Sequence, residues 1–298
     1  MKESLKHIFF LFDKVFSTLI SFFSVLLFSR LLDSKWRFRE ARTAIVLGNG
    51  PSLKNDIKEL KQYVNRASVD IWVVNNFCFS KEFFYLKPAF YVLADPNYWL
   101  PVVSPEADAL RSRFILEVKG NVNWPMTILI PLSAKGSNFC KKLKSSFISV
   151  EFYNSTPVAG SLRFSGWLMQ KQLGMPAALN VLIAALSLAL CASYKKIYIF
   201  GADHSWHEEL FLSSNGEALV KQYHFYAEEV KARPIYRPTQ VCFTVGDMFL
   251  RWGKVFKNYE VLRGFADMRK VHVINVSSKS YIDAFERSSI SDIYFRDL

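Results

Sequence analysis

A glycine-rich turn between an apolar segment and a helical pattern is the feature that most constrains this fold. Residues 44–47 (AIVL) run directly into residues 48–52 (GNGPS), and apolar residues then recur at positions 53, 57 and 60. This pattern predicts a buried strand, a tight turn and an α-helix. Such a turn presents backbone N–H groups and the positive end of a helix dipole at the carboxyl edge of a sheet, where phosphate binds.

The turn itself has two interpretations. As a nucleotide site, Gly48 and Gly50 would let a ligand approach the backbone, Pro51 would fix the helix start and Ser52 would cap the helix. As an ordinary connection, the glycines would serve turn geometry alone. The segment lacks the third glycine of a dinucleotide fingerprint and the Gly-Lys-Ser/Thr ending of a phosphate loop. The turn alone therefore does not decide between the two.

The rest of the chain alternates apolar strand patterns with helical ones, which is typical of an α/β fold. We predict helices at 100–113, 247–269 and 281–287, and leave 155–174 unassigned. Residues 176–193 are almost wholly apolar but are followed at once by a strand, so they predict a helix buried against the sheet. The whole is expected to be a Rossmann-like, mostly parallel sheet with helices on both faces. Its predicted strands are 44–47, 68–75, 89–94, 114–118, 126–130, 147–152, 195–203 and 271–276.

Residues 1–40 differ from the domain expected over residues 41–298. Residues 8–12 and 15–28 are apolar, but Asp13 and Lys14 interrupt them, so neither piece reaches the roughly 20 residues that span a bilayer. The pattern favours an amphipathic helix that lies in the membrane interface, with basic residues against acidic headgroups. A secretory signal and a helix docked on its own domain or on a partner are the alternatives. On a helical wheel the polar stripe comprises Glu3, Lys6, Lys14, Ser17, Ser21 and Ser24.

Composition narrows the classes of partner. The net charge of +12 and the aromatic content of 16% favour an anionic membrane surface, anionic substrates or nucleic acid. Because the basic residues are spread along the chain and no nucleic-acid-binding signature occurs, we do not expect a nucleic-acid partner. The four cysteines stand singly among apolar neighbours, which is typical of reduced core residues rather than a metal cluster.

Polar residues follow several predicted strands. Asn75 and Asn76 end the second strand, Asp95 follows the third, and Asp203 ends the strand that starts at residue 195. The carboxyl ends of parallel strands share one edge, where ligands sit, so we expect these side chains to border a common site. The alternative for the two asparagines is that they cap a turn.

Histidine is the natural general base for an acceptor hydroxyl at neutral pH. His204, beside Asp203, and His224, within YHFY, are the catalytic candidates; a structural or surface histidine is the alternative for each. No Asp-x-Asp, HExxH or cysteine pair occurs, so the sequence predicts neither a metal site nor a cofactor.

The string GNGPSL at 48–53 resembles the N-terminal motif of the bacterial sialyltransferases of glycosyltransferase family 42. A related GxGPSL turn occurs in flagellin-glycosylating motility accessory factors and in hydroxymethylpterin diphosphokinase-like proteins. The resemblance implies that this turn binds the donor nucleotide. Gly48 and Gly50 would form the turn, and Asn49 and Ser52 would contact the nucleotide. It also implies that Asn75 binds near the phosphate and ribose.

Two further segments extend the resemblance. YKKIYIFGAD at 194–203 is similar to a family segment ending Gly-x-Asp, which implies nucleotide roles for Gly201 and Asp203. NVSSKSYIDAF at 275–285 resembles a strand and turn with a nucleotide-contacting serine, which implies Ser280.

The chain also departs from the family pattern. Asp95 stands where the family has an asparagine, and Asn180 substitutes for a Thr-Ser-Gly turn; with Asn76 they are the substrate-binding candidates. The family's histidine lies closer to the last helix than any histidine here, so His204 and His224 are assigned from chemistry and position.

Together these features imply a metal-independent, inverting glycosyltransferase at the cytoplasmic face of the bacterial inner membrane. It would move sialic acid or a related acidic sugar from a CMP-activated donor to a glycolipid or cell-surface polysaccharide. The alternatives are a Mg²⁺-dependent diphosphokinase-like enzyme and a non-catalytic, membrane-recruited nucleotide-binding module. The sequence leaves open whether the chain forms a homo-oligomer.

Overall fold

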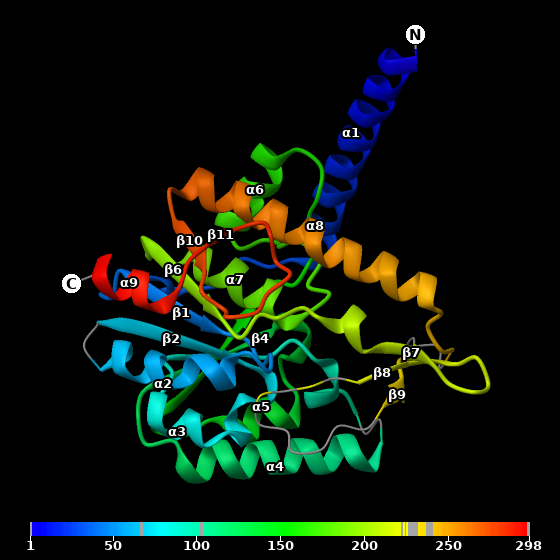
Figure 1. Cartoon of the computed structure of the whole chain (residues 1–298). Coiled ribbons are helices and arrows are strands. Elements are labelled where there is room, and N and C mark those ends of the chain that lie inside the picture. The colour runs from blue at the N-terminus through cyan, green and yellow to red at the C-terminus, as the bar shows by residue number, and fades with distance from the viewer. Residues whose placement is uncertain are drawn as a thin grey trace.

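The computed structural model describes residues 2–65, 68–101, 104–221, 223, 225, 232–236 and 241–296. It shows a central sheet between helices, with one long helix projecting from the body (Figure 1). The helices are α1 Lys2–Phe28, α2 Leu53–Val64, α3 Lys81–Leu86, α4 Pro105–Asn121, α5 Asn138–Leu143, α6 Leu162–Gln170, α7 Val181–Cys191, α8 Val245–Arg269 and α9 Ile290–Arg296. The strands are β1 Thr43–Leu47, β2 Val69–Val74, β3 Phe90–Val92, β4 Met126–Pro131, β5 Ile148–Tyr153, β6 Lys196–Phe200, β7 Leu210–Leu212, β8 Ala218–Val220, β9 Arg233–Pro234, β10 His272–Asn275 and β11 Glu286–Arg287.

The main sheet has eight strands in the order β11-β10-β6-β1-β2-β3-β4-β5. Every neighbouring pair is parallel. From β1 the chain adds strands in one direction through β5 and then returns to place β6 on the other side of β1. The order therefore reverses between β1 and β6, and a crevice opens at such a switch point beyond the carboxyl ends of the strands. The predicted fold class is confirmed.

Both faces of the central strands β1, β2, β3 and β6 are buried, which explains why these strands are almost continuously apolar rather than alternating. One core packs against α7 and α8, and the other lies beneath α2, α3, α4 and α5. The predicted buried helix is confirmed in α7, where residues 182–191 are all buried. It begins at Val181 rather than at Pro176, because the Asn180 side chain accepts a hydrogen bond from Ile183 N and caps the first turn.

Two predicted elements are wrong. Residues 114–118, predicted as a strand, lie within α4, which Ser104 caps by accepting a hydrogen bond from Ala107 N. Phe114 and Val118 are buried at helical spacing while Leu116 is exposed, so a short apolar run had been mistaken for a strand. The helix predicted at 281–287 is also absent; this segment ends in β11, and α9 begins only at Ile290.

A small antiparallel sheet, β7-β8-β9, stands between β6 and α8 in the chain and is called the lobe below. Asn215 and Gly216 lie in the turn of the β7–β8 hairpin, as the Asn-Gly signal indicates. The lobe has its own core of Ala218, Val220 and Met248, the last contributed by α8. The lobe extends beyond the carboxyl edge of the main sheet (Figure 1).

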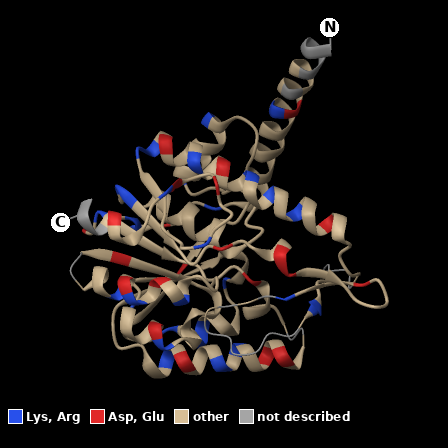
Figure 2. Cartoon of the chain, in the orientation of Figure 1, with Lys and Arg blue, Asp and Glu red and all other residues tan. Residues whose placement is uncertain are grey.

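Helix α1 is continuous through Asp13 and Lys14, which confirms the expected N-terminal helix. By length and composition alone, the 22 residues from His7 to Phe28 could cross a membrane, a test that a core helix or a signal sequence also passes. Helix α1 carries no charged residue from Val15 to its end at Phe28 (Figure 2). Large apolar side chains remain exposed along this stretch, from Ile8 to Phe28.

The polar side of α1 faces the protein rather than water. Thr18 Oγ1 accepts a hydrogen bond from Ser161 N at 2.9 Å, and Ser21 Oγ accepts one from Ala159 N at 2.8 Å. Gly160 lies between them at a φ of +93°, and a Cβ there would come within 2.3 Å of Thr18 Oγ1. The short Ser/Thr side chains thus dock α1 on its own domain and leave the apolar faces outside.

The segment after α1 packs on the main sheet. Trp36 is buried against Trp72 and Phe90, with ring centroids 6.0 and 5.9 Å apart. Arg39 forms two hydrogen bonds to Asp70, at 2.7 and 3.0 Å. The expected boundary at residue 40 therefore falls after side chains that already belong to the core.

Candidate active site

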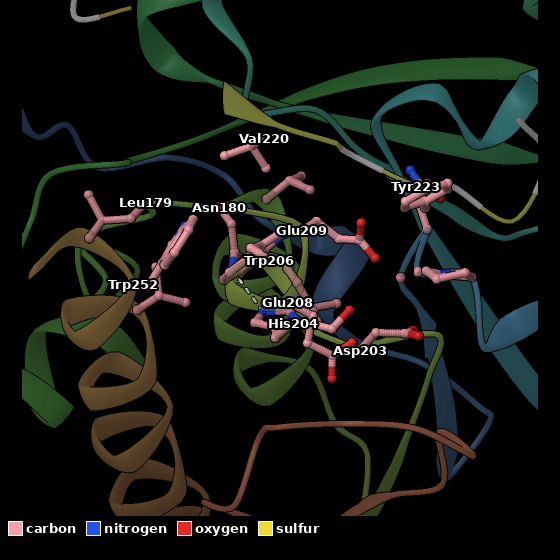
Figure 3. A pocket seen from close by; sticks show the side chains of 18 of the residues that line it. Leu179, Asn180, Asp203, His204, Trp206, Glu208, Glu209, Val220, Tyr223 and Trp252 are labelled. Carbon is pink, nitrogen blue, oxygen red and sulfur yellow. Dashed lines mark hydrogen bonds between the residues drawn. The ribbon is translucent and has the colours of Figure 1, made fainter. Parts of the chain in front are cut away.

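A cavity of about 430 Å³ lies at the carboxyl edge of the sheet, where the strand order reverses. Its walls come from the turn after β1, the end of β2, the loop after β6, the start of α7, the lobe and α8. One end is polar, with Asp203 and Glu208 in view, and the other is apolar, with Leu179, Val220 and Trp252 (Figure 3).

The glycine turn is bound to the loop after β6 through its backbone. Gly48 N donates to Phe200 O and Gly50 N donates to Gly201 O, both at 2.8 Å. A Cβ at Gly48 would lie 2.3 Å from Gly201 O, so this glycine is required for the two loops to meet. The predicted nearness of the turn and Asp203 is therefore observed, but the glycines serve loop contact as well as access to a ligand.

The Asp203 carboxylate accepts two hydrogen bonds from Ser52, the residue that precedes α2. Ser52 Oγ donates to the carboxylate at 2.7 Å, and Ser52 N donates at 3.0 Å. Ser52 itself makes no side-chain cap to α2, contrary to expectation. Burial raises the pKa of Asp203, while its bonds from Ser52 act in the opposite direction. The N–H groups of Gly48, Gly50 and Ser52 are therefore already bonded within the protein and do not face a ligand as free donors.

Two asparagines that line the cavity carry amide oxygens without a hydrogen-bond partner among the described residues. Asn49 Nδ2 donates to Val74 O at 3.2 Å, which turns its Oδ1 away from that strand. Asn75 has a φ of +45°, and its own carbonyl accepts from Tyr91 OH. Among the described residues, neither Oδ1 has a hydrogen-bond partner although both atoms are buried. Buried acceptors without donors are uncommon, so a ligand hydroxyl or N–H group would complete them.

His204 is held in the cavity wall by Asn180 and Tyr259. Its Nε2 lies 3.0 Å from Asn180 Nδ2 and 2.7 Å from Tyr259 OH. Because Asn180 Oδ1 accepts from Ile183 N, its Nδ2 faces the ring and can only donate. Nε2 is therefore the acceptor, and the ring proton is assigned to Nδ1. Burial lowers the pKa of His204 to about 3, which makes it neutral and a weak base at pH 7.

Charged side chains border the polar end. Lys279 pairs with Glu208, which also accepts from Tyr281 OH at 2.6 Å. These bonds lower the pKa of Glu208 and raise that of Lys279. Lys221 and Arg251 also line the cavity, as does Glu209. Within the described ranges, no group of three or more His, Cys, Asp or Glu side chains could hold a metal ion.

Four candidates that the structure describes do not line the cavity: Ser52, Asn76, Asp95 and Ser280. Asn76 accepts from Tyr98 OH, and Asp95 accepts from Asn97 N at 2.9 Å. Ser280 donates to Ala202 O at 2.6 Å and so joins two loops. His224 lies outside the described residues, so its role stays a prediction.

Sequence reasoning missed three aromatic residues of the site. Trp206 lies 4.3 Å from His204 between ring centroids and 6.3 Å from Trp252, nearly parallel to it. Tyr259 bonds His204 from α8. Trp252, Val255 and Tyr259 recur at helical spacing, and this periodicity indicated one buried face without indicating what it faces.

Comparison with known proteins gives no family assignment. No protein-family model matches the chain, and no curated protein matches it. A solved structure that it resembles is the MAf glycosyltransferase from Magnetospirillum magneticum AMB-1, with a TM-score of 0.48 and 14% identity. The alignment covers 96% of this chain and 41% of the other, so this chain spans about two-fifths of that neighbour's length. A likeness at this level assigns neither family nor activity.

Proposed function

We propose that this protein is a glycosyltransferase whose nucleotide-activated donor binds at the polar end of the cavity. The supporting observation is that Asn49 and Asn75 bring buried, unpaired amide oxygens to the switch point of a parallel sheet. Nucleotides bind at this place in open α/β sheets. Ribose hydroxyls and the amino group of a base are donors that would satisfy these oxygens.

The proposed donor is a CMP-activated sialic acid or a related acidic sugar, as the GNGPSL resemblance implies. Lys221 and Lys279 would neutralise the phosphate and the sugar carboxylate, since the N–H groups of Gly48, Gly50 and Ser52 are already bonded. A leaving nucleoside monophosphate carries less charge than a diphosphate. This suits a metal-independent site whose described residues offer no metal-ligand cluster.

Direct attack by an acceptor hydroxyl would invert the anomeric centre. In this scheme His204, neutral and protonated on Nδ1, is a hydrogen-bond donor rather than the proton acceptor. The role of base is retained for His224, for which the sequence is the only support. Replacing His224 with glutamine should then abolish transfer and leave donor binding intact.

Nucleotide specificity tests the proposal directly. At a hundredfold excess over Kd, CMP should stabilise the protein by about 2.7 kcal/mol, or roughly 5 °C in Tm, and more than UDP, GDP or ATP. Asn49→Ala should remove most of this shift, because it deletes one of the two acceptors. Asn121→Ala, on the exposed end of α4, is the matched control and should retain it.

Other outcomes favour the alternatives. A larger shift with ATP and Mg²⁺, lost on adding EDTA, would favour the diphosphokinase-like enzyme. A CMP shift without transfer to any acceptor would favour a binding module. A larger shift with UDP or GDP than with CMP would show that the donor carries that nucleotide instead of CMP.

We also propose that α1 holds the enzyme at the cytoplasmic face of the bacterial inner membrane. Its apolar faces are exposed while its Ser/Thr side is docked on the domain. Apolar surface of this extent, adjoining basic residues, is typical of membrane-associated helices.

Deleting residues 2–24 should move the protein from the membrane pellet to the soluble fraction. The deletion ends before Val25, Ser29, Trp36 and Arg39, whose contacts tie the following segment to the domain, so the CMP-dependent thermal shift should persist. Fractionation with and without a high-salt wash measures the release and distinguishes an electrostatically held helix from an inserted one. Sedimentation of the deletion variant with membranes would contradict the role of α1.

A further inference from the structure

The apolar end of the cavity differs chemically from the polar end, where the nucleotide is proposed to bind. It is called the apolar arm here and is defined by Leu179, Trp206, Val220, Phe243, Met248 and Trp252. It lies where two cores meet, since Trp206 packs on the main core while Val220 and Met248 form that of the lobe. Nothing in the proposed transfer from a charged nucleotide sugar requires a space of this character.

The described residues of the arm offer few groups for hydrogen bonding. Arg251 donates to Leu179 O at 3.3 Å, and the Asn180 amide is already bonded to His204 and to Ile183 N. A sugar ring would leave hydroxyl groups without partners in such surroundings, whereas a hydrocarbon chain requires none.

Apolar surface continues from the arm to the outside of the molecule. On α8, Met248 and Trp252 line the arm, while Phe249 and Leu250 between them are 53% and 70% exposed. On the β7–β8 hairpin, Leu212 is 60% exposed. In Figure 1, α1 projects from the top of the body, and the lobe with the first turns of α8 extends from its right-hand side. A hydrocarbon chain that enters along the lobe and the start of α8 would meet these apolar side chains on its way to the arm.

We infer that the apolar arm binds the hydrocarbon chain of a membrane lipid, which makes the acceptor of the proposed transferase lipid-linked rather than a free glycan. The inference rests on the proposed function for the identity of the second substrate. The arm itself has a direct readout, however, because Trp206 and Trp252 line it and the described helix α1 contains no tryptophan.

The test places the full chain in phosphatidylethanolamine–phosphatidylglycerol nanodiscs, with or without dibrominated acyl chains, and measures tryptophan quenching. Brominated chains should quench the wild type, and most of the quenching should disappear in a Trp206→Phe/Trp252→Phe double variant. Trp167→Phe, on α6 and 49% exposed, is the matched control and should keep it. Equal quenching in wild type and double variant overturns the inference.

A second variant tests the arm while leaving both tryptophans in place. Leu179→Asp places a carboxylate in the arm at a half-buried position, and it should weaken quenching and raise KM for a lipid-linked acceptor by about tenfold. Transfer to a chain-free acceptor and the CMP thermal shift should not change, and Leu116→Asp on the exposed face of α4 should be silent in every assay. Equal loss on both acceptors would mean that the arm holds sugar and would overturn the inference. Absence of a CMP shift in the wild type would instead count against the proposed function.

Discussion

A Gly48→Ala variant is expected to lose about 3 kcal/mol of unfolding free energy, the upper end for overpacking a core. The added Cβ would lie 2.3 Å from Gly201 O and 3.0 Å from its carbonyl carbon. Both are backbone atoms, and the hydrogen bonds from Gly48 N and Gly50 N hold the two loops at this separation. Relief requires these bonds to lengthen, so CMP binding should be lost as well. Urea unfolding and the CMP thermal shift measure the two effects.

Gly50→Ala should strain the same loop contact and also displace Asp203. The added Cβ would lie 2.6 Å from the backbone atom Gly201 O and 1.9 Å from Asp203 Oδ2, which bonds Ser52. Gly253→Ala is the matched control, because no atom lies within 4 Å of its Cβ and the residue is inside α8. It should stabilise the protein by about 0.5–1 kcal/mol. If Gly48→Ala proved as stable as this control, the close approach of the two loops would be wrong.

The sheet could be predicted from the sequence because its signals are local. Continuous apolar runs such as residues 44–47 and 126–130 mark strands covered on both faces, and the structure places them in β1 and β4. The run at 114–118 carried the same signal within a helix, since five apolar-rich residues fit either period. The Ser104-Pro105 start of α4 was the signal that would have decided it.

The site could be predicted only as far as the sheet edge. Strand direction brings Asn75 and Asp203 to the same edge, but it does not say which way a side chain turns. Asn76 and Ser280 bond to neighbouring loops instead of facing the cavity, because Tyr98 OH and Ala202 O satisfy them. The N–H groups of the glycine turn bond to the loop after β6, which lies about 150 residues further along the chain. A local sequence pattern does not show a contact between segments so far apart.

For helix α1, too, the sequence predicted the pattern but not what the pattern contacts. The helical wheel separated the polar stripe from the apolar faces correctly, but the pattern does not name what each face meets. The stripe docks on residues 159–161 because Ser and Thr are small enough for the backbone at Gly160 to approach. A surface helix usually buries its apolar face, so the inverted arrangement of α1 is what makes a lipid partner the natural inference.

Acid should destabilise the wild-type protein more steeply than a His204→Asn variant. Burial lowers the pKa of His204 from 6.5 to about 3 in the folded state, and an exposed histidine in the unfolded chain keeps a pKa near 6.5. Above pH 6.5 the residue is neutral in both states and adds no pH dependence. Below it only the unfolded chain gains the proton, so the free energy of unfolding should fall by about 1.4 kcal/mol per pH unit down to about pH 3.

Asparagine is the replacement of choice because His204 has a φ of +52°, a conformation that asparagine tolerates better than most residues. The variant loses the contact with Tyr259 and should be less stable at pH 7.5, but its curve should decline less steeply between pH 6.5 and 4. The raised pKa values of Asp56 and Asp203 act in both proteins and cancel in the difference. Parallel curves would show that His204 titrates normally in the folded protein. A charged ring could then serve as an acid or, once deprotonated, as a base, and the assignment of its proton to Nδ1 as a fixed donor would have to be abandoned.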